Sequence, residues 1–502
     1  MRRAPSLPRL ERAVRGQVTT DPEALLTFGH DASHLSGRPR AVVAPADPDD
    51  VAALVRWARR THTSLVPRGG GTSLDGESVP ENGAVVVDLS GWSRVLEVDA
   101  AGLSARVQPG VVNRDLQEAL HPHGVFFPPN PGSWTVSTVG GNVGTNASGM
   151  RSFRYGPTRA WVREVEAVLG TGARVRLGSR VAKRSVGPDL LQLFIGSEGT
   201  LGVATEVTLR LAPLPPVRRG AVVPLPPTAS CGELARRLTR LPSSGISAVE
   251  YLDRGCVTAI AERRDVGWPT ETALLLIEVE AEDPDDVAHR LDGVRRALRE
   301  SGVTGEFTVV GDADELWTAR GTSGDVLVEQ YGHHVREDVA VPLAHLDALI
   351  DELDRIARRE NVPYRLFGHL GEGSLHPNYV VDPASRTGGR IRAAVLRASR
   401  RLDGTISAEH GIGRLKRPYL AEELGAAAVD LLYAVKRACD PDGILNPGKL
   451  YPPRRGAQSL SRSPSEGGGG TARRASPSGV GSSSSPRTKA FRRVPRTRAA
   501  PP

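Results

Sequence analysis

The 502-residue chain is long enough for two or three domains with a substantial core. Its net charge of +8 is uneven: residues 451–502 hold eleven Arg and Lys against one Glu, a net +10, which leaves residues 1–450 at −2. The basic character therefore belongs to this tail and gives no reason to expect nucleic-acid binding by the folded part. Three widely spaced cysteines argue against a disulfide framework and against an iron–sulfur cluster.

No apolar run of about 18 residues occurs, and the N-terminal arginines are not followed by an apolar stretch. We therefore expect no membrane span and a cytoplasmic protein, with peripheral membrane attachment as the alternative.

Apolar segments and helix signals alternate along the first 120 residues, which indicates an α/β or α+β fold. A helix is expected to start at Asp47, an N-cap residue followed by Pro48 and two acidic residues. A second helix is expected at 113–120. Strands are expected at 40–45, 63–68, 84–89 and 104–108.

Residues 66–76 read V-P-R-G-G-G-T-S-L-D-G. The three glycines permit positive φ angles and let backbone N–H groups approach a phosphate, with hydroxyl donors and one positive charge beside them. An ordinary surface turn is the alternative. The spacing disfavours both the dinucleotide-binding G-x-G-x-x-G pattern and the P-loop. The candidate phosphate-binding residues are Arg68, Gly69, Gly70, Gly71, Thr72 and Ser73.

A second segment rich in small residues runs from 128 to 149, without helix periodicity. Trp134 and several valines within it favour an ordered loop against a large flat ligand over a disordered linker. A hairpin is expected at 165–177, then the sequence I-G-S-E-G-T-L-G-V at 195–203, then a strand at 205–211.

Residues 40–213 resemble the FAD domain of the vanillyl-alcohol-oxidase-type flavoproteins, most closely in the D-2-hydroxyacid dehydrogenase branch. The matching motifs are P-R-G-G-G-T-S (67–73), S-T-V-G-G-N-V-G-T-N-A-S-G (137–149) and S-E-G-T-L-G-V (197–203). The resemblance implies an α+β protein with an FAD-binding domain of this (PCMH) type followed by an α+β substrate cap. Besides residues 68–73, it implies FAD contacts at Ser137, Thr138, Gly140, Gly141, Asn146, Ser148, Gly149, Glu198, Val203 and Asn446.

One departure from the family pattern lies in the first loop, where Ser73 and Asp75 replace glycine and serine. A carboxylate near a diphosphate is repulsive, so we expect Asp75 to point outward. No His or Cys in this loop is obviously placed for covalent attachment of FAD.

The second half contains a strand at 273–279 and amphipathic helices at 284–301 and 342–360, expected to build the cap over the flavin. Its histidines gather in F-G-H-L-G-E-G-S-L-H-P-N (367–378) and T-I-S-A-E-H-G-I-G (405–413). Imidazole and carboxylate are ligands that Zn²⁺ prefers, although histidines at this spacing are usually structural. The resemblance implies a divalent metal, zinc or similar, held by His369, His376 and Glu409 with Asn378 beside them.

The implied reaction is oxidation of a D-2-hydroxy acid of the D-lactate, glycolate or D-2-hydroxyglutarate type by hydride transfer to the flavin. His410 is the candidate acceptor of the hydroxyl proton. Arg320, in L-W-T-A-R (316–320), is the first candidate for binding the substrate carboxylate, and Arg336 is the second. Both could instead be solvated surface arginines. Electrons must then leave to a separate protein, a quinone or O₂.

Two other functions fit the same fold. One is a flavoprotein transferase similar to alkylglycerone-phosphate synthase, suggested by H-G-I-G-R-L-K-R-P-Y-L (410–420). The other is a non-catalytic electron-transfer subunit. A helix is expected at 420–439, and N-P-G-K (446–449) is typical of the family where the chain returns to the flavin. The expected divisions are 1–35 (lead-in), 36–216 (FAD domain), 217–403 (cap), 404–450 (return segment) and 451–502 (disordered tail).

Overall fold

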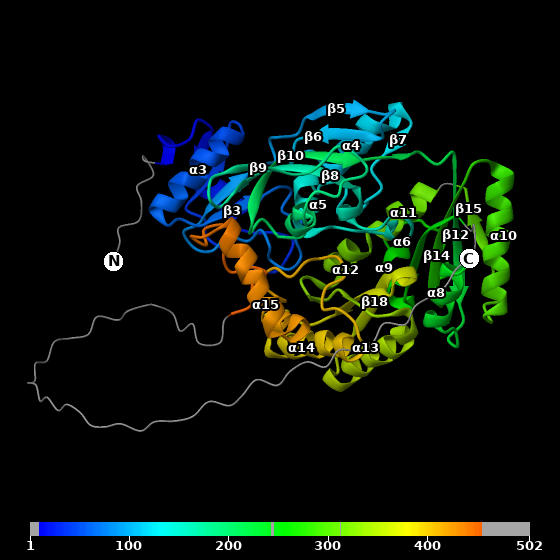
Figure 1. The fold of residues 1–502 in the computed structure, drawn as a ribbon. Coiled ribbons are helices and arrows are strands. Elements are labelled where there is room, and N and C mark those ends of the chain that lie inside the picture. The colour runs from blue at the N-terminus through cyan, green and yellow to red at the C-terminus, as the bar shows by residue number, and fades with distance from the viewer. Residues whose placement is uncertain (1–9, 242–244, 312, 454–502) are drawn as a thin grey trace, which may run out of the picture. The chain divides into compact units, whose positions relative to one another are not determined.

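The computed structural model describes residues 10–241, 245–311 and 313–453. These residues form three large β-sheets and one two-stranded sheet, with helices packed on them (Figure 1). Most of the basic tail, which its composition predicts to be disordered, lies outside the described residues, as do residues 1–9 of the lead-in.

The first sheet has four strands in the order β1, β2, β4, β3, of which the last three run parallel. Parallel strands need a crossover connection, and α3 (Pro48–Thr61) supplies it. Asp47 caps α3 as predicted, because its carboxylate accepts a hydrogen bond from Asp50 N–H. The strands are β1 (Gln17–Thr19), β2 (Ala41–Ala44), β3 (Leu65–Arg68) and β4 (Val85–Asp88).

The second sheet is antiparallel, in the order β5, β6, β10, β8, β9, and confirms the predicted hairpin and the strands that flank it. One face of this sheet packs against α4 (Asn113–Leu120), which is the helix predicted at 113–120. The strands are β5 (Val95–Asp99), β6 (Ser104–Val107), β8 (Val162–Leu169), β9 (Arg174–Gly178) and β10 (Gly202–Arg210).

The segment 128–149 is ordered, but the prediction that it lacks a helix is wrong, because α5 (Val139–Thr145) forms within it. Thr138 caps this helix by accepting a hydrogen bond from Gly141 N–H, and Asn146 ends it in the left-handed conformation. Val139 and Val143, one turn apart, are both buried. Two apolar residues among glycines are too few to produce a periodic pattern, so capping and packing define this helix.

The third sheet is antiparallel, and its eight strands run in the order β15, β12, β14, β13, β18, β19, β16, with β17 paired to β19. The predicted strand at 273–279 is β14. The strands are β12 (Val217–Leu225), β13 (Ile246–Leu252), β14 (Ala273–Ala281), β15 (Thr308–Val310), β16 (Val335–Arg336), β17 (Val339–Ala340), β18 (Tyr364–His369) and β19 (Ser374–Tyr379).

Helices cover both faces of the third sheet (Figure 1). In β14, Leu275 and Ile277 belong to one core, while Leu274 and Leu276 belong to the other, because alternate residues of a strand point to opposite faces. The first core includes α8 (Cys231–Thr239), α10 (Pro284–Glu300), α13 (Leu346–Glu360) and α14 (Arg386–Arg401). The second includes α9 (Arg254–Ala261), α11 (Ala313–Gly321) and α12 (Ser323–Tyr331).

The chain returns to the first sheet after α15 (Leu420–Cys439), which lies between β3 and α14 in Figure 1. Leu65 N–H donates to Ile444 O, and Asn446 N–H donates to Leu65 O, each at 2.8 Å. The Asn446 side chain then donates to the carbonyl oxygens of Glu77 (2.8 Å) and Glu198 (2.7 Å). One amide thus ties the return segment to two loops that lie far from it in the sequence.

Lys449 provides a stability test in this segment. It is 1% exposed, and among the described residues its Nζ has no hydrogen-bond partner. Burial lowers the pKa of Lys449 to about 8, although Glu81 partly opposes this. The pKa of this lysine is 10.5 in the unfolded chain. Between pH 8 and pH 10.5 the unfolded chain therefore binds a proton at Lys449 that the native state does not, so the native state should gain stability as pH rises through this window.

Replacing Lys449 by Met should therefore raise the free energy of unfolding at pH 7 by about 3 kcal/mol, the energy of the pKa shift. Urea unfolding of both proteins at pH 7 and pH 10 measures this. The gain should shrink at the higher pH, and a gain that does not depend on pH would contradict the prediction.

Candidate active site

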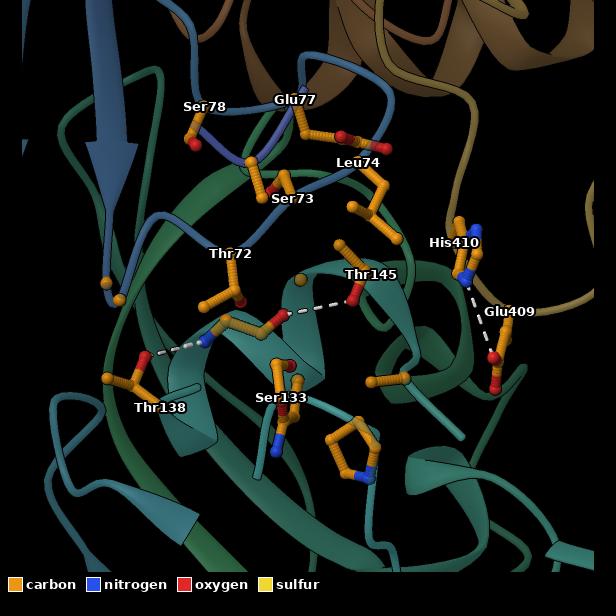
Figure 2. Close-up of a pocket in the computed structure, with 18 of the residues that line it drawn as sticks. Thr72, Ser73, Leu74, Glu77, Ser78, Ser133, Thr138, Thr145, Glu409 and His410 are labelled. Carbon is orange, nitrogen blue, oxygen red and sulfur yellow. Dashed lines mark hydrogen bonds and ion pairs between the residues drawn. The ribbon is translucent and has the colours of Figure 1, made fainter. Parts of the chain in front are cut away.

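A cavity of about 440 Å³ is lined by residues from the glycine loop, the 131–150 segment, the third sheet and the loop after α14. Figure 2 shows Thr72, Ser73 and Leu74 on one side of it and Glu409 and His410 on another. Segments far apart in the sequence therefore meet around one space.

The glycine loop and the second small-residue segment lie directly against each other. A Cβ on Gly69 would collide with Thr138 Oγ1, and a Cβ on Gly70 would collide with the carbonyl oxygen of Val136. Gly71 has a φ of +66°, which favours glycine. The close approach therefore requires glycine at positions 69 and 70, and the positive φ favours glycine at position 71.

Some polar atoms at the cavity wall are buried without a hydrogen-bond partner. Among the described residues, Glu77 Oε1, Asn142 Nδ2 and Asn446 Oδ1 are buried without a hydrogen bond, and all three residues line the cavity. Buried polar groups are normally satisfied, so these atoms fit a bound ligand that offers both donors and acceptors. A glycine-walled cavity with such atoms suits FAD.

Most of the predicted site residues line this one cavity. They are Arg68, Gly69, Gly70, Gly71, Thr72, Ser73, Thr138, Gly140, Gly141, Ser148, Glu198, Arg320, Arg336, His369, His376, Asn378, Glu409, His410 and Asn446.

Four predicted FAD contacts do not belong to the cavity lining. Ser137 is 3% exposed, and the Asn146 side chain is engaged by Arg159 N–H (3.0 Å). Gly149 packs against the backbone of Asn130, and Val203 belongs to the core beneath the first sheet. These four positions lie outside the cavity lining, although other residues of the same segments belong to it.

The expectation that Asp75 points outward is wrong. Asp75 is 3% exposed, and Lys416 Nζ lies 3.1 Å from its Oδ2. It does not line the cavity, so repulsion of a diphosphate is avoided by burial against a cation rather than by exposure to solvent.

Three imidazoles converge on one carboxylate oxygen. Glu409 Oε1 lies 3.2 Å from His369 Nε2, 3.3 Å from His376 Nε2 and 3.4 Å from His410 Nε2. His369 ends β18 and His376 lies in β19, so the hairpin between these strands brings them together, while Glu409 and His410 come from the loop after α14. The ring planes of His376 and His410 are nearly parallel, with centroids 5.0 Å apart.

The predicted ligand set lies close enough together to hold a metal ion. One ligand atom each from His369, His376 and Glu409 lies within 4.8 Å of the others. A second set, Asp338, His376 and His410, also meets this distance. Asp338 Oδ2 accepts hydrogen bonds from the backbone N–H groups of residues 408, 409 and 410 at 2.8–3.0 Å, whereas among the described residues Asp338 Oδ1 and His376 Nδ1 are buried without a hydrogen bond, so the geometry allows both sets.

The charges of the cluster set its protonation. Burial lowers the pKa of His369, but the carboxylates of Glu250 and Glu409 outweigh it and hold that pKa well above its usual value. Burial raises the pKa of Glu409, yet its imidazole neighbours hold it well below the usual range. For His410, burial again lowers the pKa, and Asp338 and Glu409 leave it raised overall. Burial dominates at His376, whose pKa is lowered.

Two carboxylates that sequence reasoning missed organise this cluster. Asp338 holds the loop of Glu409 and His410 through the three N–H bonds described above. Glu250, in β13, contacts His369 and Arg320 from behind. One sequence signal could have revealed Glu250. It is an acidic residue inside the apolar strand I-S-A-V-E-Y-L (246–252), and a buried carboxylate is tolerated only when it has a partner.

Neither candidate arginine is a solvated surface residue, because both line the cavity. Arg320 is 5% exposed and donates to Glu250. Arg336 donates to the carbonyl oxygen of Ala32 at 2.9 Å. The Asn378 amide is held at both ends, by His334 Nε2 (3.0 Å) and by the His376 carbonyl oxygen (2.7 Å).

The fold and the cavity together define a two-domain flavoprotein with an FAD-binding domain and an α+β cap. A family model described as "FAD binding domain" matches residues 39–178, and one described as "FAD linked oxidases, C-terminal domain" matches residues 214–450. The chain belongs to this family of FAD-linked oxidases, and the prediction of an FAD-dependent oxidoreductase is confirmed.

Curated relatives cover most of the chain. The glycolate oxidase subunit GlcD of Bacillus subtilis is 31% identical over 436 residues, which are 85% of this chain and 92% of the relative. A D-2-hydroxyglutarate dehydrogenase of Stutzerimonas stutzeri is 32% identical over 452 residues, 87% of this chain and 96% of the relative. These relatives agree with the branch that the motifs indicated.

Solved structures confirm the predicted fold class. A substrate-bound p-cresol methylhydroxylase matches with a TM-score of 0.74 at 17% identity, covering 88% of this chain and 97% of that one. An alkyldihydroxyacetonephosphate synthase matches with a TM-score of 0.67 at 19% identity, covering 89% of this chain and 86% of that one. In the part of the chain that the structure describes, no helix is long and apolar enough to cross a membrane.

Proposed function

We propose that the protein oxidises a D-2-hydroxy acid to the 2-oxo acid, with FAD as the oxidant and a separate electron acceptor. The observation that carries this proposal is the meeting, in one cavity, of the glycine loop, two arginines and the imidazole–carboxylate cluster. The names of the relatives support the substrate class. We further propose that the cap begins with β12 at Val217.

The chemistry can be assigned to residues by charge. When bound, FAD supplies the acceptor for the C2 hydride. His410 takes the hydroxyl proton at Nε2, and Asp338 and Glu409 stabilise the imidazolium that results. The proton and the hydride together account for the two electrons and two hydrogens that the alcohol loses.

The substrate carboxylate needs a guanidinium with free donors. The Arg320 side chain already contacts Glu250 through Nε and Nη2. Among the described residues, the Arg336 side chain makes one hydrogen bond, to the carbonyl oxygen of Ala32. Burial lowers the pKa of Arg336, so an incoming anion would stabilise its cation. We therefore assign the direct contact to Arg336 and place Arg320 beside it, the reverse of the order that the sequence suggested.

We assign a divalent cation, zinc or similar, to His369, His376 and Glu409. Such a cation would lower the pKa of the substrate hydroxyl. Because Glu250 and Glu409 raise the pKa of His369, a cation would have to displace a proton to bind its Nε2.

Anaerobic stopped-flow reduction of the purified protein by D- and L-2-hydroxy acids tests the proposal. We expect at least one D-enantiomer to bleach the flavin absorbance and its L-enantiomer to leave it unchanged. A flavin that no hydroxy acid reduces would overturn the proposal and favour the transferase, which carries out no net oxidation.

Gly70 tests the assignment of the glycine loop to FAD. Replacing Gly70 by Ala should force the loop away from the Val136 carbonyl oxygen, because the backbone there has no room for a Cβ. We expect the purified variant to retain less than about a tenth of the FAD, a loss on the scale of 1.4 kcal/mol or more.

The measurement is the ratio of flavin to protein absorbance after gel filtration. Gly91→Ala is the matched control, since a Cβ on Gly91 meets nothing within 4 Å. Full FAD content in Gly70→Ala would show that the loop does not bind the cofactor closely.

A further inference from the structure

Glu250 is a fully buried carboxylate, 0% exposed, in a strand that is otherwise mostly apolar. Burying an unpaired carboxylate is costly, so its presence requires partners for both oxygens. Glu250 lies opposite His369 in the register of β13 and β18, which places the carboxylate directly behind the imidazole cluster.

The two oxygens of Glu250 contact different parts of the proposed active site. Oε1 lies 2.6 Å from His369 Nδ1. Oε2 accepts from Arg320 Nε at 2.9 Å and lies 2.6 Å from Arg320 Nη2. One side chain therefore joins a candidate metal ligand to an arginine of the cavity wall.

The contact at Oε1 determines which nitrogen of His369 is available. A carboxylate only accepts hydrogen bonds, so Nδ1 must carry a proton, and Nε2, which faces Glu409 at 3.2 Å, is the ring nitrogen left to bind a cation placed between them. The contact at Oε2 meanwhile fixes the orientation of the Arg320 guanidinium, whose planar donors match a carboxylate.

We propose that Glu250 is a positioning residue that holds the His369 ring with Nε2 toward Glu409 and, at the same time, the Arg320 guanidinium at the cavity wall. This inference rests on the proposed function. A glutamine cannot replace it, because its single amide oxygen can serve either His369 or Arg320, and its NH₂ group then faces a second donor.

The test compares Glu250→Gln with wild type for binding of Zn²⁺ alone, by competition with a chromophoric chelator, and for steady-state oxidation of the best D-2-hydroxy acid. We expect zinc affinity to fall by about 10–100-fold, as found for partners of metal-bound histidines. KM should rise by at least about 10-fold because Arg320 loses its partner. Glu250→Asp, which keeps both acceptor oxygens, should recover part of both losses.

Glu278→Gln is the matched control. Glu278 is also 0% exposed and lies in the adjacent strand β14, but it pairs with Arg151 (3.0 Å) and Arg218 (3.4 Å). The Glu278→Gln variant should lose as much thermal stability as Glu250→Gln, while its zinc affinity and KM stay at wild-type values.

Wild-type zinc affinity and KM in Glu250→Gln would overturn this inference and leave the proposed function standing. Equal losses in both glutamine variants would also overturn it, because the effect would then be general destabilisation. A wild type that neither binds zinc nor oxidises a hydroxy acid would overturn both proposals.

Discussion

Replacing His410 by Ala is expected to leave FAD bound and to slow flavin reduction by a D-2-hydroxy acid by about 10²–10⁴-fold, the usual contribution of a general base. His410 lines the cavity, its side chain is 20% exposed, and two carboxylates raise its pKa against the effect of burial. Without the imidazole, the hydroxyl proton has no comparable acceptor at this position. Single-turnover reduction followed at the flavin absorbance measures the effect.

His345 offers a control histidine for this experiment. Its side chain is 39% exposed, and its Nδ1 lies 2.8 Å from the Leu402 carbonyl oxygen, outside the cavity lining. His345→Ala should reduce its flavin at the wild-type rate. If His410→Ala did so too, His410 would be removed from the mechanism.

Replacing Asp338 by Ala is expected to lower the free energy of unfolding by about 3–5 kcal/mol, the range for breaking a buried charge pair. Asp338 is 0% exposed and accepts backbone N–H bonds from three consecutive residues, and Lys416 Nζ lies 3.6 Å from its Oδ2. The substitution leaves those donors unpaired and the buried lysine with Asp75 as its remaining close anion. Flavin reduction should also fail, because Glu409 and His410 lose their anchor.

Urea unfolding measures the stability change, and Asp292→Ala is the control. Asp292 forms an exposed pair with Arg295 (2.8 Å) on α10, so its loss should cost less than about 1 kcal/mol. A change of similar size in both variants would show that Asp338 has no special structural role. Asp338→Asn keeps one acceptor oxygen and should fall between the two.

The sequence predicted those parts of the site whose residues are neighbours in the chain. His369 and His376 lie on one hairpin, and Glu409 and His410 are adjacent, so each pair falls within one short motif. Glu250 and Asp338 were missed because their contacts depend on strand register and on how distant segments pack. Glu250 and His369, for example, are 119 residues apart.

The same distinction applies to the fold. Strong apolar patterns and caps located the start of α3 and the strands β2, β3 and β4 to within two residues, whereas β1, in the expected lead-in, was not predicted. The helix at Val139–Thr145 was missed because its glycines carry no periodic signal and its position follows from packing against the glycine loop. The choice between Arg320 and Arg336 likewise depended on Glu250, a partner that the sequence alone does not reveal.

The Asn446 amide has a consequence for biosynthesis. Its bonds reach carbonyl oxygens 369 and 248 residues earlier in the chain, so this wall of the cavity is completed only when residue 446 has left the ribosome. We therefore expect cofactor capture to be a late event, with nascent chains stalled before residue 440 releasing FAD on gel filtration and chains stalled well beyond residue 453 retaining it.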